Sequence, residues 1–115
     1  MKEGIVLFAH SSRDPEWARP FEKIQEEVRR RGIEVRLAYL EIMQPSLGEA
    51  LADLSGKVDS IRIVPLFLGY GGHIRKDLPD LVAAAKPKVK VIIEPPVGEA
   101  PQVIEAIAAL VGRRA

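Results

Sequence analysis

Four short apolar runs alternate along the chain with four stretches of helical periodicity, and this alternation most constrains the fold. The runs are rich in β-forming residues and cover 5–9, 35–40, 61–64 and 89–93. Continuous runs of this kind are typical of strands that are covered on both faces, as in a parallel sheet. After each run, apolar residues recur at the spacing of an amphipathic helix. The pattern predicts an α/β fold built from four βα units.

Several residues predict where the helices begin and end. Asp14 followed by Pro15 is typical of an N-cap and first helical residue, and Pro20 should kink that helix or delay its start. Ser46 and Glu49 have the spacing of a capping box. The four helices are marked by apolar positions, which are Trp17, Phe21, Ile24 and Val28; Leu47, Ala50, Leu51 and Leu54; Leu78, Leu81, Val82 and Ala85; and Val103, Ile104, Ile107, Leu110 and Val111.

The length and connectivity indicate one doubly wound domain over residues 1–115. There is no linker, low-complexity tract or charge block to divide the chain. Right-handed crossovers and a strand order of 2-1-3-4 give the most economical arrangement, with helices on both faces of a four-stranded parallel sheet. Strands 1 and 3 are then neighbours whose helices leave to opposite faces. Open α/β sheets bind ligands at such a switch point, at the carboxyl ends of the strands.

The only two histidines follow these two strands. His10 ends the first strand and His73 follows the third, so the topology places both at the carboxyl edge of the switch point. The two segments also resemble each other, because each places a histidine four residues before an aspartate, Asp14 or Asp77, that can cap the next helix. We therefore expect both histidines in loops that face a common cleft.

The composition excludes several classes of protein. Hydrophobic residues make up 47% and charged residues 29%, which is typical of a globular chain rather than a disordered one. The net charge of +1 gives no general case for nucleic acid or a membrane surface as partner. The absence of cysteine excludes disulfides and thiolate metal sites. No Walker A, G-x-G-x-x-G or nucleophile-elbow motif occurs. We expect no signal peptide, no membrane span and a cytoplasmic location.

Two imidazoles without sulfur suit divalent iron, cobalt, nickel or zinc, held in an open or transient site rather than a closed structural one. A neutral imidazole is also a general base near neutral pH. Glu41, at the carboxyl end of the second strand, is a third candidate. Each of the three taken alone is also explained as an ordinary surface residue, and the convergence of His10 and His73 is what favours a site.

Other residues near the histidines suggest a pocket for a large planar ligand. Leu68 and Tyr70 could form an apolar bed with Gly71 and Gly72, where glycines allow close approach of the ligand. Leu66 and Phe67 are better explained as the end of the core. The side chains that could bind carboxylates or another anion are Ser11, Ser12, Arg13, Arg75 and Lys76. Each of them is equally well explained as an ordinary surface or loop residue.

The order of these motifs resembles the small CbiX-type sirohydrochlorin chelatases. The resemblance runs from about residue 4 to residue 94 and rests on His10-Ser-Ser-Arg-Asp-Pro, Leu40-Glu41 with Pro45-Ser-Leu, and the segment from Pro65 to Pro79 around Gly-Gly-His73. It implies a chelatase-like fold and ATP-independent insertion of Co²⁺, or in relatives Ni²⁺ or Fe²⁺, into sirohydrochlorin for cobalamin or siroheme synthesis. The implied metal and catalytic positions are His10 and His73, with Glu41 as the third catalytic residue.

The resemblance also implies how the protein works as a whole. The divalent metal would be a substrate rather than a tightly bound cofactor, and a short chain of this type would form a homodimer that closes the cleft. Because metal binding requires neutral imidazole, activity should fall below about pH 6.5. A non-catalytic metal or tetrapyrrole carrier is the alternative. A phosphoryl-transfer enzyme or phosphatase is disfavoured, because a histidine phosphatase would have arginine where Ala9 stands.

Overall fold

The computed structural model describes residues 2–112 and contains one four-stranded parallel sheet of order β2-β1-β3-β4. Residues 1 and 113–115, which the predicted domain includes, lie outside the described part. The strands are β1 (Glu3–Ala9), β2 (Glu34–Tyr39), β3 (Ser60–Pro65) and β4 (Lys90–Ile93). The predicted strand order is confirmed. Pairing of β3 with β1 ends at Pro65, as expected for a residue without an amide hydrogen.

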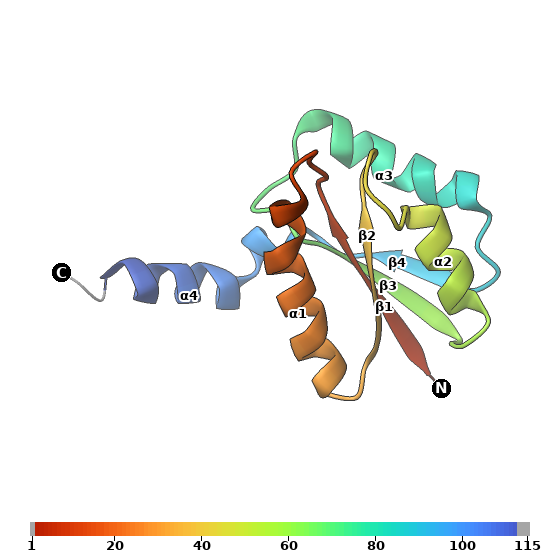
Figure 1. Ribbon diagram of the computed structural model, residues 1–115, viewed down its shortest axis with the longest axis horizontal. Coiled ribbons are helices and arrows are strands. Elements are labelled where there is room, and N and C mark those ends of the chain that lie inside the picture. The colour runs from red at the N-terminus through yellow and green to blue at the C-terminus, as the bar shows by residue number, and fades with distance from the viewer. Residues whose placement is uncertain (1, 113–115) are drawn as a thin grey trace.

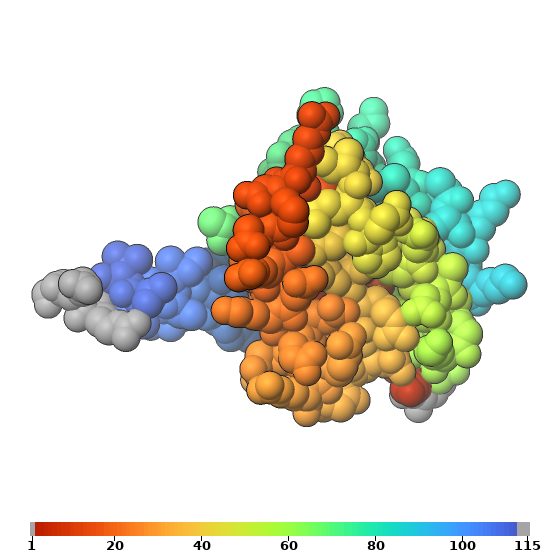
Figure 2. Space-filling model, viewed as in Figure 1, coloured from red at the N-terminus to blue at the C-terminus, as the bar shows by residue number. Residues whose placement is uncertain are grey.

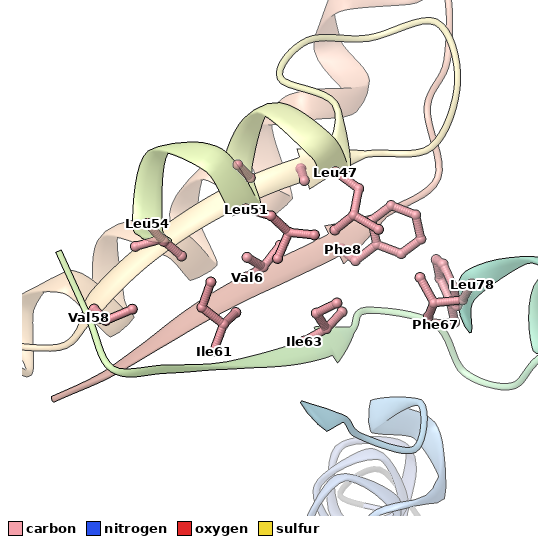
Figure 3. Close-up of a cluster of buried hydrophobic side chains, with 12 residues drawn as sticks. Val6, Phe8, Leu47, Leu51, Leu54, Val58, Ile61, Ile63, Phe67 and Leu78 are labelled. Carbon is pink, nitrogen blue, oxygen red and sulfur yellow. The ribbon is translucent and has the colours of Figure 1, made fainter. Parts of the chain in front are cut away.

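Helices cover both faces of the sheet, as predicted (Figure 1). On one face, α1 (Ala18–Arg30) packs over β1 and β2, where Ile5, Leu7 and Leu37 are buried. The other face carries α2 (Leu47–Ser55) and α3 (Gly72–Ala85). Figure 3 shows the core under these two helices, which consists of Val6, Phe8, Ala38, Leu47, Ala50, Leu51, Leu54, Val58, Ile61, Ile63, Phe67 and Leu78. Successive side chains along a strand point to opposite faces of the sheet, so β1 supplies Val6 and Phe8 to one core and Ile5 and Leu7 to the other.

The local helix signals act largely as predicted. Asp14 caps a short 3-10 helix, η1 (Pro15–Trp17), and the α-helix proper begins only at Ala18, which agrees with the delay expected from Pro20. The capping box of Ser46 and Glu49 forms at the start of α2 with both of its hydrogen bonds.

The third helix begins earlier than predicted. Gly71 is the N-cap of α3, so His73 lies in the first helical turn and not in a loop. Asp77 is inside the helix and does not cap it, which overturns that part of the predicted likeness to Asp14. The physical reason is that Ile74 packs against the same core as Leu78, one turn later, and this extends the apolar face towards the N-terminus.

The last helix, α4 (Pro101–Gly112), covers neither face of the sheet. It follows a second 3-10 helix, η2 (Val97–Glu99), and projects from the body of the molecule (Figures 1 and 2). None of its residues is buried. No helix within residues 2–112 is both long enough and apolar enough to cross a membrane.

Candidate functional site

His10 is held at the carboxyl end of β1 by two aromatic side chains. Its imidazole lies on the ring of Phe67, with 4.3 Å between ring centroids and 31° between ring planes. Its backbone carbonyl accepts a hydrogen bond of 2.7 Å from the indole Nε1 of Trp17. The ring nitrogens of an imidazole bind metals in the ring plane, so a stacked neighbour restrains the side chain without occupying its ligating edge. The exposed His10 is therefore oriented for binding.

Phe67 connects the two predicted halves of the site. It is buried in the segment between β3 and α3, the segment that leads to His73. It also contacts Phe8 and Tyr70, with ring centroids 6.0 and 6.2 Å away. Because β1 and β3 are adjacent and parallel, His10 and the start of α3 lie at the same edge of the sheet. The structure therefore places both histidines at the carboxyl edge of the sheet, beside β1 and β3, as expected.

His73 is exposed in the first turn of α3. No side chain caps this helix. The first amide hydrogens of an α-helix have no partner within the helix, and the helix dipole makes that end positive. The surroundings of His73 therefore favour anionic groups on a bound ligand.

Glu41 lies at the same sheet edge but does not join the histidines. Within residues 2–112, no group of three or more His, Cys, Asp or Glu side chains is close enough to hold a metal ion. Glu41 has a φ of +73°, a left-handed conformation that costs a residue with a side chain of the order of 1–3 kcal/mol. It borders a hollow of about 310 Å³ between the β2 end and the helices α2 and α3, which Leu47 and Leu81 also line.

The loop after His10 is tied to the end of β2. The hydroxyl of Ser11 donates a hydrogen bond to the carbonyl of Leu40, and the amide of Ser12 points at the sulfur of Met43, 3.3 Å away. Leu40 in turn donates its amide hydrogen to the carbonyl of Ala9. The hydroxyl of Ser11 therefore fixes the loop after β1 to the end of β2, and any contact of Ser11 with a ligand would come in addition.

The predicted apolar bed divides as expected between core and surface. Leu66 and Phe67 belong to the two cores, whereas Leu68 is 74% exposed. The hydroxyl of Tyr70 donates to the carbonyl of Glu94, and burial, with a smaller effect of Glu99, raises the pKa of this phenol. Leu68 is therefore the exposed apolar side chain of the bed, and Tyr70 is held at its edge by the hydrogen bond to Glu94.

Three cations stand near the histidines without an acidic partner. Arg13, Arg75 and Lys76 are exposed, and in the described part of the chain none of them forms an ion pair. Other arginines, such as Arg36 and Arg62, are each paired with two carboxylates. The unpaired cations therefore remain available to a negatively charged ligand.

The sequence reasoning missed the residues that support the site. Trp17 and Phe67 were expected only as helix-face and core residues, and Gly98 was not considered. The amide of Gly98 donates to the carbonyl of Phe67, and a Cβ at this position would stand 1.9 Å from the carbonyl oxygen of Leu68. One signal was present in the sequence: the indole of the single tryptophan needs a hydrogen-bond acceptor when it packs against the protein.

Comparison with known proteins identifies the family of the chain. The family model described as CbiX matches residues 4–114. The chain belongs to the CbiX family.

Relatives of the same family resemble the chain over most of its length. A protein named sirohydrochlorin cobaltochelatase from Sulfolobus acidocaldarius is 30% identical over 105 residues, which cover 90% of this chain and 85% of the relative. A protein of the same name from Saccharolobus solfataricus is 35% identical over 89 residues, covering 76% and 70%. Family membership therefore rests on sequence as well as on fold.

Solved structures give the same fold. The crystal structure of a CbiX protein from Marinobacter aquaeolei VT8, whose name places it in cobalamin biosynthesis, is 32% identical and has a TM-score of 0.87, covering 97% of this chain and 96% of that one. The sirohydrochlorin chelatase SirB from Bacillus subtilis subspecies spizizenii, solved with cobalt, has a TM-score of 0.81 at 21% identity. It matches 98% of this chain but only 51% of its own length, so one CbiX-family unit corresponds to half of that protein.

Proposed function

We propose that this protein inserts a divalent metal, Co²⁺ first among the candidates, into sirohydrochlorin without ATP. The observation that carries the proposal is the placement of His10, held on Phe67, and His73, on the first turn of α3, at one edge of the sheet. The names of the relatives support the substrate. Ni²⁺ and Fe²⁺ remain candidate substrates because imidazole and carboxylate ligands bind all three metals.

The two histidines would receive the metal and deliver it to the macrocycle. Insertion of M²⁺ replaces two pyrrole N–H bonds with metal–nitrogen bonds and releases two protons. Neutral imidazoles can hold the metal weakly and accept those protons. Glu41 stands apart from the histidines, so we assign it to proton transfer at the macrocycle rather than to metal binding.

The substrate would be bound beside the two histidines, against the segment that leads into α3. Sirohydrochlorin carries many carboxylates, which the unpaired Arg13, Arg75 and Lys76 can neutralise. Its flat ring would lie against Leu68 and Tyr70. The remaining proposed contacts are Ser11, Gly71 and Gly72, where small side chains allow close approach.

We further propose that the protein acts as a cytoplasmic homodimer in cobalamin or siroheme synthesis. The exposed positions of His10, His73 and Leu68 leave the site open on one side. A macrocycle bound there needs a second wall to exclude water. A second copy of the chain would supply that wall.

The test is a metal-insertion assay with purified protein, sirohydrochlorin and Co²⁺, Ni²⁺ or Fe²⁺, followed by the visible spectrum. We expect many turnovers per protein chain and a rate above the uncatalysed one for at least Co²⁺. Binding of metal or tetrapyrrole in a fixed ratio without turnover would instead identify a carrier. No acceleration with any of the three metals would overturn the proposed activity.

A further inference from the structure

The helix α4 exposes a continuous apolar face. Four of its large apolar residues, Ile104, Ile107, Leu110 and Val111, have 44–73% of their surface exposed. Together with Val103 their spacing places them on one side of the helix. Its single charged residue in the described range is Glu105. A helix of this composition is stable in water only when its apolar face is covered.

The sheet has an uncovered region of matching size. On the face that carries α1, this helix packs over β1 and β2 but leaves β3 and β4 without a helix (Figure 1). Val64 is half-buried there and Ile92 is 42% exposed. A hollow of about 520 Å³ lies beside the start of α4, lined by Arg62, Val64, Glu94 and residues 95–97 and 99–102. The 12 residues of α4 extend about 18 Å and the six of β3 about 20 Å, so the lengths agree.

The connection between β4 and α4 keeps these two surfaces apart within one chain of the structure. Pro96 is buried, and the backbone of Gly98 lies directly against that of Leu68. Ala100 is extended and Pro101 begins the helix, which then projects from the body of the molecule (Figure 2). Among the elements of the described chain, α4 contacts only η2 to any extent.

The accessible surface also indicates a missing neighbour. The chain exposes 7693 Å², whereas a compact monomer of 12.7 kDa exposes about 6,200 Å². The excess is more than the roughly 800 Å² that each partner buries in a standard interface. The Cα radius of gyration of 14.7 Å is likewise above the roughly 13 Å of a compact chain of this size.

We infer that two copies of this chain exchange their α4 helices. The α4 of each copy lies over Val64 and Ile92 of the other, in the place where a helix following β4 belongs in a doubly wound sheet. A two-fold axis satisfies both helices and both sheet faces at once, because the same chain carries the two complementary surfaces. The inference rests on the homodimer proposed above but not on the metal-insertion activity.

Light scattering on the full chain during size-exclusion chromatography tests the interface. The wild-type protein should have twice the 12.7 kDa mass of the chain. Ile107→Glu places a charge in the apolar face and should halve the measured mass. Ala109→Glu introduces the same charge on the opposite side of the helix and should leave the dimer intact. A monomeric wild type, or a dimer that survives Ile107→Glu, would overturn the inference.

Cross-linking tests the exchange itself, and the natural chain has no cysteine to interfere. In the double variant Ile92→Cys, Ile107→Cys, a short bis-maleimide should join residue 92 of one copy to residue 107 of the other. Denaturing gels should then show a covalent dimer, while each single variant should give much less. A product of monomer mass with both thiols consumed would show that α4 folds back on its own sheet, and would overturn the exchange. Metal insertion is measured separately, so a failed assay with an intact exchanged dimer would count only against the proposed activity.

Discussion

His10 and His73 differ in how their side chains are positioned. The imidazole of His10 lies on Phe67 and its carbonyl accepts the indole hydrogen of Trp17, whereas His73 is set by the first turn of α3. The two residues come from different elements that share only the carboxyl edge of the sheet. A metal bound between them is therefore sensitive to the packing of Phe67, which joins the two segments.

Substitution of either histidine should abolish most of the activity and leave the fold intact. We expect His10→Ala and His73→Ala each to slow metal insertion by at least about 100-fold, the usual effect of removing a group that transfers protons or holds a reactant. Both side chains are exposed, so stability should change by no more than about 0.5 kcal/mol in His73→Ala and by up to about 1.5 kcal/mol in His10→Ala, which also loses the contact with Phe67. The assay is the change in visible spectrum together with thermal unfolding.

Lys88→Ala is a matched control for the histidine variants, because Lys88 is exposed and precedes β4 at the opposite edge of the sheet. Its insertion rate should equal that of the wild type. If both histidine variants kept the full rate as well, the assigned site would be wrong.

Gly98 should be the glycine that is least tolerant of a side chain. A Cβ there would stand 1.9 Å from the carbonyl oxygen of Leu68, and the backbone would have to move. We expect Gly98→Ala to reduce the free energy of unfolding by at least about 2 kcal/mol. Gly48→Ala is the control: Gly48 lies in α2 with open space around it, so alanine should be neutral or stabilising by up to about 1 kcal/mol. Equal unfolding midpoints in urea for the two variants would show that the backbone of Gly98 does not lie as close to Leu68 as the structure has it.

Among the elements, α2 is the helix whose start is most clearly fixed by its own sequence. Both hydrogen bonds of the capping box are present between Ser46 and Glu49. We expect Ser46→Ala to cost about 1 kcal/mol of stability in chemical denaturation, and Ser46→Asp to retain most of it, because aspartate accepts the same amide hydrogen. If Ser46→Asp lost as much stability as Ser46→Ala, the contribution of Ser46 would not come from capping α2.

Arg36 joins β2 to α2 through its ion pair with Asp53 and also pairs with Glu34 of its own strand. The hydrogen bonds from Arg36 lower the pKa of both carboxyls. Their pKa values are thus lower in the folded than in the unfolded protein, so this stabilisation is complete above the ordinary values of 4.5 and 3.8 and is lost as the pH falls through the folded-state values.

The expected outcome is that Arg36→Met is less stable than the wild type at pH 7 and that the difference shrinks in acid. Thermal unfolding between pH 7 and pH 2.5 measures it. Arg30→Met is the control, because its pair with Glu27 is exposed on α1 and should contribute little at any pH. A difference that is constant with pH would exclude a contribution from these carboxyls.

At the scale of the whole molecule, α4 links stability to association. A dimer that dissociates on unfolding becomes more stable as its concentration rises, by about 1.4 kcal/mol per dimer for each tenfold increase. The unfolding midpoint of the wild type should therefore rise with protein concentration. That of Ile107→Glu should not change. A wild-type midpoint that is independent of concentration would contradict the exchanged dimer.

Most of the architecture could be predicted because it follows from local patterns. The four apolar runs and the helical periodicity gave the elements, and handedness with short connections gave the order β2-β1-β3-β4. The start of α3 was placed too late because Gly69, Gly71 and Gly72 indicate a loop, while the packing of Ile74 on the core favours helix. Ile74 stands four residues before Leu78, which is the spacing of one helical face, but the core that both side chains contact is formed by residues far apart in the chain.

The sequence by itself determined that His10 and His73 would share one edge of a parallel sheet, because strand order and the positions of strand ends follow from short-range patterns. Only the tertiary structure decided how His10 is oriented and where α4 goes. His10 lies on Phe67, and α4 is directed away from the sheet by the close contact of Gly98 with Leu68. Both depend on van der Waals contact between distant segments, which is fixed only when the whole chain has packed.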